Sequence, residues 1–169
     1  MTNTGRLDVV NRLPDAHAAE QLRACNASPR WIEQVLAHRP YADLDSVLDT
    51  AEHVARDLDW GEVRRALEAH PRIGERAGGG STEAQWSRRE QSAVATTDAR
   101  TQELLRTRNA EYERRFGHVF LIRAAGRSAE EMLTELDRRL ANAEDRERAE
   151  VTEQLAQITR LRLQTLLAG

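Results

Sequence analysis

The chain has 169 residues, of which 40% are hydrophobic and 31% are charged, and its formal net charge is −3. This composition is ordinary for a globular protein, and the length is enough for one hydrophobic core. A slightly acidic chain lacks the net basic face that a nucleic-acid-binding protein needs. No apolar run is long enough to cross a membrane, so we expect neither nucleic acid nor a membrane as a partner.

Three features bear on the cellular compartment. Residues 1–5 lack the basic and apolar stretches of a secretory signal, and residues 167–169 are not a peroxisomal Ser-Lys-Leu address. The single cysteine, Cys25, cannot form an internal disulfide. We therefore expect a protein of the reducing cytoplasm.

The first half of the chain has helical periodicity throughout. We expect a first helix that Asp15 caps and that reaches about Cys25, and a second that Ser28 caps, with Pro29 at its first position. A third helix is expected over 44–58. Asp59 is expected to cap a fourth, which carries Trp60, Val63 and Leu67.

The second half continues the helical pattern, with one interruption. We expect a short helix from Ser87, a longer one over 98–115 that ends at Gly117, one that begins with a Ser128–Glu131 capping box, and a last one over 144–167. The strand-like run is 119–122. The sequence thus predicts an all-α, single-domain bundle over 1–169, with about eight or nine helices and one short extended segment near 119–122.

His70 is the first candidate for chemistry. Trp60, Val63, Leu67 and His70 follow the spacing of one helix face, so we expect the His70 side chain to point where that apolar face points. Pro71 limits how far the helix can run. Histidine titrates near neutrality, which suits acid–base catalysis. The alternative is a core histidine whose imidazole bonds to a backbone carbonyl.

Residues 87–91, Ser-Arg-Arg-Glu-Gln, have two interpretations. Ser87 and Glu90 match a capping box, and the sequence alone favours that role. The two roles are compatible, because Ser87 can cap while the Glu90 carboxylate faces the amide protons of a substrate. Gln91 supplies both a donor and an acceptor.

Arg162 interrupts an apolar stripe of the last helix, formed by Val151, Leu155, Ile158 and Leu166. Arg160 falls on the opposite, solvated stripe, so we expect Arg160 outside and Arg162 inside. A buried guanidinium requires a partner. That partner is either an acidic side chain or a bound anion, which arginine can grip through two hydrogen bonds.

Three segments together carry a family resemblance. They are His-Pro-Arg-Ile-Gly-Glu at 70–75, Ser-Arg-Arg-Glu-Gln at 87–91, and Phe-Gly-His-Val-Phe-Leu-Ile at 116–122, which leads into Ala-Ala-Gly-Arg-Ser at 124–128. In this order and at these separations they resemble the 2-oxo-4-hydroxy-4-carboxy-5-ureidoimidazoline (OHCU) decarboxylases of urate breakdown. The resemblance extends from Asn-Arg-Leu at 11–13 to Ile-Thr-Arg-Leu-Arg-Leu at 158–163. His118 departs from the aromatic residue of many relatives.

The resemblance implies the decarboxylation of this anionic ureidoimidazoline to (S)-allantoin, without a cofactor or a metal. It implies that His70, Glu90 and Arg162 are catalytic. It also implies a set of substrate-binding residues: Pro71, Ser87, Arg88, Arg89, Glu90, Gln91, Ile122, Arg123, Ala124, Ala125 and Gly126. For the last five, the alternative is a buried extended segment that enters a tight turn.

Metal ligation has no support in the sequence itself, because no histidine lies three or four residues from another and no Glu-x-x-His pair exists. Two other functions stay open: a non-catalytic helical interaction module, and a decarboxylase or hydrolase that acts on a related ureido acid. We also expect a homodimer, since helical proteins of this size often pair through apolar stripes.

Overall fold

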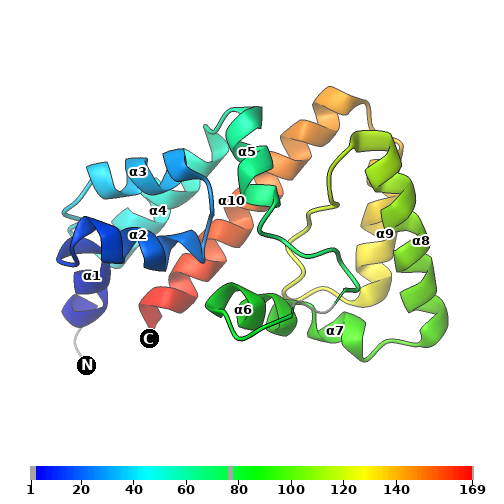
Figure 1. Cartoon of the computed structure of the whole chain (residues 1–169), viewed down its shortest axis with the longest axis horizontal. Coiled ribbons are helices and arrows are strands. Elements are labelled where there is room, and N and C mark those ends of the chain that lie inside the picture. Colours follow the sequence, from blue (N-terminus) through cyan, green and yellow to red (C-terminus); the bar gives the residue numbers. More distant parts are fainter. Residues whose placement is uncertain (1–2, 76–77, 169) are drawn as a thin grey trace. The chain divides into compact units, whose positions relative to one another are not determined.

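The computed structural model describes the backbone of residues 3–75 and 78–168, and the side chains of 7–75 and 78–168. In these ranges every regular element is a helix (Figure 1). The predicted all-α class is therefore confirmed. The described ranges contain ten helices, where the sequence predicted eight or nine. None of the described helices combines the length and the apolar content that crossing a membrane requires.

The chain divides into two compact units. The first unit comprises Met1–Ala66 and Leu155–Gly169, and the second comprises Leu67–Gln154. The helix α10, Glu144–Ala168, contributes residues to both units. This division leaves the predicted single domain over 1–169 untested.

The helices of the first unit begin at capping residues that the sequence largely predicts. Besides part of α10, they are α1 (Asn3–Asn11), α2 (Asp15–Arg23), α3 (Pro29–Ala37), α4 (Leu44–Arg56) and α5 (Trp60–Leu67), whose last residue falls in the second unit. The Ser28 hydroxyl accepts a hydrogen bond from the Trp31 amide at 3.1 Å, as predicted for α3. The Asp59 carboxylate accepts from the Glu62 amide at 3.0 Å, which confirms the predicted start of α5.

One expectation for the first unit was wrong, and one helix was not predicted. Asp15 is not a cap, because Pro14 holds the N-cap position of α2 and Asp15 is already helical. The Asp15 carboxylate instead pairs with Arg39. The sequence did not predict α1, because the apolar residues of that helix do not gather on one face.

Trp31 joins α3 to α4 in the core of the first unit. Its side chain is fully buried, and its indole N–H donates to the Ala51 carbonyl at 2.9 Å. Val35, Val47 and Leu48 are buried as well. The apolar faces that the sequence predicts for these two helices therefore meet each other.

Besides part of α10, the second unit contains α6 (Thr82–Glu90), α7 (Ser92–Ala95), α8 (Ala99–Phe116) and α9 (Ala129–Leu140). Asp98 caps α8 by accepting from the Thr101 amide at 2.7 Å, and Gly117 ends it with a φ of 79°. The Ser128 hydroxyl accepts from the Glu131 amide at 3.1 Å and so caps α9. These three helix boundaries agree with the sequence prediction.

The predicted start of a helix at Ser87 was wrong. The helix α6 begins at Thr82, and the Ser81 hydroxyl caps it by accepting from the Ala84 amide at 3.1 Å. Ser87 lies inside this helix and is 3% exposed. The Ser-x-x-Glu pattern therefore does not mark a helix start, because Ser81 provides a cap six residues earlier.

The segment 119–122 forms neither helix nor strand. Phe120, Leu121 and Ile122 are nonetheless buried, and Phe120 and Ile122 belong to a core cluster with Leu105 and Tyr112. The strand-like pattern of this segment reflects burial rather than pairing with another strand.

An ion pair between Arg139 of α9 and Glu147 of α10 lies at the centre of the second unit. Both side chains are at most 1% exposed, and the Arg139 Nε donates to Glu147 Oε1 at 2.8 Å. The Arg139 Nη1 also donates to the Leu121 carbonyl at 2.6 Å, and its guanidinium lies 4.5 Å from the centre of the Phe120 ring. The Tyr112 hydroxyl donates to Glu147 Oε1 at 2.5 Å. One buried charge pair thus fixes α8, α9, α10 and the segment 119–122.

Replacement of Arg139 by leucine will destabilise the protein by about 3–5 kcal/mol, because it leaves the Glu147 carboxylate buried without its cation. The matched control is Arg138→Leu. Arg138 is 44% exposed and pairs with Glu135 and Glu150 at the surface, so its loss will cost less than about 1 kcal/mol. Urea unfolding of the two variants makes the comparison. Equal losses of stability would contradict the importance of the buried pair.

Tyr41 gives the first unit a dependence on alkaline pH. The Tyr41 hydroxyl donates to the Val35 carbonyl at 2.5 Å. Burial raises the pKa of Tyr41 to about 12, although the positive charge of Arg39 acts to lower that pKa. The unfolded chain loses this proton near pH 10, so the stabilisation is complete below pH 10 and is lost as the pH rises toward about 12. Urea unfolding between pH 9 and 12 will show the wild-type protein losing stability relative to Tyr41→Phe. A constant difference between the two proteins would contradict this pKa.

Candidate active site

The residues 70–75, which we call the His70 loop, connect α5 to the segment before α6. The helix α5 ends at Leu67, and the His70 amide donates to the Leu67 carbonyl at 3.0 Å in the turn that follows. His70 therefore lies just beyond the helix that carries Trp60 and Val63, and the expected direction of its side chain stays a prediction. The turn starts early because Pro71 has no N–H and disfavours a helical conformation at the residue before it. His70 is half-buried.

The His70 loop contains a tight turn at 72–75. The Glu75 amide donates to the Arg72 carbonyl at 3.1 Å, and Gly74, the third residue of the turn, has a φ of 95°. A positive φ at this position is the mark of a type II turn. A Cβ at Gly74 would meet no atom within 4 Å, so the backbone conformation, and not lack of space, requires glycine.

The helix α8 holds this turn from one side. Asn109, which is 4% exposed, donates from Nδ2 to the Ile73 carbonyl at 2.7 Å. The Arg72 Nε donates to both carboxylate oxygens of Glu113, at 2.8 and 3.0 Å, and this hydrogen bonding raises the pKa of Arg72. The Ile73 side chain belongs to the same core cluster as Leu105. The backbone of the loop is therefore tied to a long helix at successive residues.

Gln91 holds the same turn from another side. Its side-chain oxygen accepts a hydrogen bond from the Gly74 amide at 3.1 Å. Gln91 is the C-cap of α6, directly after Glu90, which is the last helical residue and is half-buried. The second unit thus brings the His70 loop and the end of α6 together. The Gln91 oxygen bonds to the loop, and the expected contact of Gln91 with a substrate stays a prediction.

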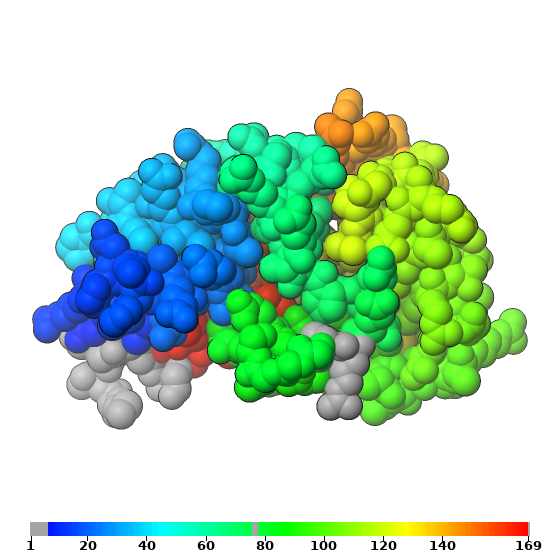
Figure 2. All heavy atoms as spheres, in the orientation of Figure 1, coloured from blue at the N-terminus to red at the C-terminus, as the bar shows by residue number. Residues whose placement is uncertain are grey.

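The other predicted residues of α6 differ in exposure. Ser87 is buried, and it shares one face of the helix with Glu90 and Gln91 by its spacing of three and four residues. Arg88 is half-buried and donates from Nη1 to the Gly79 carbonyl at 2.9 Å. Arg89 is exposed. Atoms of this green segment lie at the surface in Figure 2.

The predicted pocket edge at 122–126 is an irregular segment that ends in a turn. Ile122 and Ala124 are buried, while Ala125 is partly exposed. The Arg123 amide donates to Gln154 Oε1 at 2.9 Å, and Gly126 has a φ of 79°. Among the described side chains, the Arg123 Nε is a buried nitrogen for which no hydrogen-bond partner is present. A buried segment that enters a tight turn, one of the two alternatives above, is confirmed, and a substrate role is compatible with it.

Arg162 lies in the first unit, where it is 3% exposed. Its Nη1 donates to the Ala24 carbonyl at 3.2 Å. Arg160 instead reaches the surface and bonds to Asp49 and Glu52, each at 2.8 Å. The prediction from helical spacing, with Arg162 inside and Arg160 outside, is confirmed. Since His70 and Glu90 belong to the second unit, the shared role of the three side chains stays a prediction.

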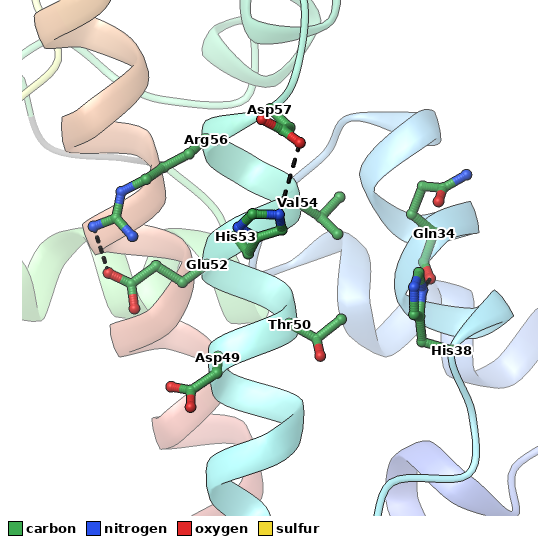
Figure 3. A pocket seen from close by; sticks show the side chains of 9 residues that line it. All are labelled: Gln34, His38, Asp49, Thr50, Glu52, His53, Val54, Arg56 and Asp57. Carbon is green, nitrogen blue, oxygen red and sulfur yellow. Dashed lines mark hydrogen bonds and ion pairs between the residues drawn. The ribbon is translucent and has the colours of Figure 1, made fainter.

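Two cavities contain residues that the sequence did not single out. One, of about 250 Å³, adjoins the His70 loop and is lined by residues of the loop and of α8, among them Gln102, Arg106 and Asn109. The other, of about 670 Å³, lies between α3 and α4 (Figure 3). Within the part of the chain that the structure describes, no three His, Cys, Asp or Glu residues are grouped to hold a metal ion.

The groove in Figure 3 has the character of an ordinary charged surface. In this groove the His53 Nε2 lies 3.8 Å from the Asp57 Oδ2, and the Arg56 Nη2 lies 2.6 Å from the Glu52 Oε1. These two contacts lie along α4, while Asp49 and Glu52 also bond to Arg160 of α10. None of its lining residues was a predicted site residue.

The fold and the three sequence segments define a class of all-α decarboxylase. The sequence model of the OHCU decarboxylases matches residues 11–164. The chain therefore belongs to the OHCU decarboxylase family, as the resemblance of its segments predicted. The match includes the His70 loop, the end of α6, the segment 122–126 and Arg162.

Individual relatives agree with this assignment. The chain is 30% identical over 158 residues to the uric acid degradation bifunctional protein TTL of Arabidopsis thaliana, an alignment that covers 88% of this chain and 47% of that protein. The chain thus spans about half the length of this curated relative.

Two solved structures are similar to the chain. One is a crystal structure of OHCU decarboxylase in the presence of (S)-allantoin, with a TM-score of 0.76, 26% identity, and coverage of 89% of this chain and 99% of that one. The other is (S)-allantoin synthase, with a TM-score of 0.68 and coverage of 98% of this chain and 54% of that one. At 16% identity, the second structure supports the fold alone.

Replacement of Gly74 by alanine will destabilise the protein by about 1–2 kcal/mol, because an L-residue is strained at this positive φ. Gly80→Ala is the control: a Cβ there also meets no atom within 4 Å, but Gly80 does not have a positive φ. Urea unfolding of both variants tests the requirement. If Gly74→Ala and Gly80→Ala have the same free energy of unfolding, the turn does not need glycine at position 74.

Proposed function

We propose that this chain decarboxylates 2-oxo-4-hydroxy-4-carboxy-5-ureidoimidazoline to (S)-allantoin in urate breakdown. The family match over residues 11–164 carries this proposal. The likeness to an OHCU decarboxylase structure, which the chain covers almost completely, supports it further. The same fold could also accept a related ureido acid, and activity on a panel of such acids distinguishes the two substrates.

The chemistry of this substrate requires neither a metal nor an organic cofactor. The carboxylate and a hydroxyl share one ring carbon, next to a carbon–nitrogen double bond whose carbon bears the ureido group. When the carbon–carbon bond to the carboxylate breaks, carbon dioxide leaves and the electron pair forms a carbon–carbon double bond to the ureido-bearing carbon. The electrons of the carbon–nitrogen double bond move to the ring nitrogen, which takes up a proton, so the intermediate is a neutral enol. The resulting enol takes up a proton at the ureido-bearing carbon and loses one from its hydroxyl, which gives allantoin. The protein has to orient the breaking bond and deliver the proton to one face.

We assign His70 as the acid–base group that acts at the hydroxyl and at the protonated carbon. Glu90 accepts hydrogen bonds from the ureido N–H groups, and Arg162 binds the anionic end of the substrate. A salt bridge from Arg162 to the departing carboxylate would stabilise the ground state and slow the step. A contact between Arg162 and a ring carbonyl, whose charge grows as carbon dioxide leaves, avoids this cost.

Structural features of the separate residues support these roles. The backbone of the His70 loop is held by Asn109 and Gln91, so the imidazole is presented from an ordered turn. Glu90 ends α6 directly before Gln91. The Arg162 guanidinium is buried, and a buried cation favours an anionic ligand.

The further contacts belong to the same proposal. Pro71 of the loop, residues 87–91 and the backbone of 122–126 bind the substrate, with Gly126 allowing close approach. The cytoplasmic location and the homodimer stay predictions from the sequence.

Replacement of His70 by asparagine will lower the turnover number by at least about 100-fold while the protein remains folded. The unstable substrate is generated from urate in the cuvette, and circular dichroism follows the appearance of one allantoin enantiomer. His17→Asn is the control, because His17 lies exposed on α2 of the first unit. Full activity of His70→Asn would remove this histidine from the mechanism. Racemic allantoin at the uncatalysed rate with the wild-type protein would refute the proposed function itself.

A further inference from the structure

We propose that Asn109 is a positioning residue for His70: by holding the Ile73 carbonyl, it fixes where the imidazole stands relative to the substrate. The inference rests on the proposed function, because it concerns the group that moves the proton. Asn109 lies in the middle of α8, 39 positions along the chain from His70. Nothing in its sequence surroundings marks it as part of the site.

The hydrogen bond between Asn109 and Ile73 is buried. The Asn109 side chain is 4% exposed, and its Nδ2 donates to the Ile73 carbonyl at 2.7 Å. A buried carbonyl in a turn has no helix or sheet to supply its donor, so the loss of this N–H would leave it unsatisfied. The loop would then move to find another donor.

A movement of Ile73 also moves His70. Only Pro71 and Arg72 separate His70 from Ile73, and the proline ring fixes one of the backbone torsions between them. The His70 amide is also bonded to the Leu67 carbonyl at 3.0 Å. A shift of Ile73 therefore moves a short, stiff stretch of chain, and the imidazole moves with it.

The other two hydrogen-bonded attachments of the loop are more exposed than the one made by Asn109. Glu113 binds Arg72, but the Arg72 side chain is 49% exposed, so solvent screens this ion pair. The Gly74–Gln91 bond lies at an exposed glycine. In the Asn109 bond both residues are buried, with Asn109 4% and Ile73 6% exposed, which makes it the attachment that matters most.

The row of residues on α8 supports the same conclusion. Leu105, Asn109 and Glu113 follow each other at intervals of four residues, which places them on one face of the helix. Leu105 shares the core cluster with the Ile73 side chain, Asn109 bonds to the Ile73 carbonyl, and Glu113 bonds to Arg72. One helix face thus contacts the side chain, the backbone and the charged neighbour of a single turn.

The test uses Asn109→Leu, which has a similar volume and no donor, in the full-length chain. We expect the turnover number to fall at least about tenfold while KM changes less than about twofold, because a displaced acid–base group impairs the chemical step and not binding. Asn109→Ser, which removes the same amide with a smaller side chain, is measured alongside. Thr101→Val is the control, a buried polar residue of the same helix two turns earlier; it should keep the wild-type turnover number.

A second measurement does not depend on activity. In protein labelled at its five histidines, the imidazole resonances report each ring separately. The Asn109 variants should shift the His70 resonance and its titration, and leave His17, His38 and His53 unchanged. An unchanged His70 resonance overturns the positioning role, as does a similar shift of all histidines, which would indicate a general loss of structure. If the wild-type protein shows no turnover, the proposed function fails, and the resonances alone decide whether Asn109 positions His70.

Discussion

The buried guanidinium of Arg139 connects several parts of the second unit. It pairs with Glu147 of α10, donates to the Leu121 carbonyl and lies over the Phe120 ring, while Tyr112 of α8 donates to the same carboxylate. These hydrogen bonds satisfy the Glu147 carboxylate and the Leu121 carbonyl, polar groups that would be costly to bury without a partner. The pair therefore fixes the irregular backbone just before 122–126, the segment to which the family resemblance assigns substrate contacts.

The helix α8 extends this constraint to the rest of the candidate site. Tyr112 reaches the buried pair, and Asn109 reaches the His70 loop, from positions three residues apart. The two loops that we expect to meet the substrate within the second unit are thus supported by one helix. Catalytic and binding residues often lie on loops that a rigid scaffold positions, and α8 is such a scaffold for these two loops.

The sequence predicts most helix boundaries, because capping and turn chemistry are local. Residues of the types that favour helix ends do mark the ends of helices in the structure. They are Ser28, Asp59, Asp98 and Ser128 at the starts of helices, and Gly117 at the end of one. Ser87 misleads, because a Ser-x-x-Glu pattern in the middle of a helix looks the same as one at its start. The helix α1 escapes prediction, since its apolar residues do not form a stripe.

The candidate site is predictable only where periodicity or a family motif marks it. Helical spacing separates Arg162 from Arg160 correctly, and the same argument would have found Arg139, which follows Met132 and Leu136 at the spacing of one apolar face. Asn109 has no such signal, because its partner is a backbone carbonyl far away in the sequence. The family match over residues 11–164 also argues against a purely structural helical module.

We expect the ligand to bind at the His70 loop. The most direct test is a titration of histidine-labelled protein with (S)-allantoin, observed through the five imidazole resonances. We expect His70 to respond in a saturable way, while His38 and His53, which line the groove of Figure 3, stay constant. A response confined to those two histidines would contradict the account.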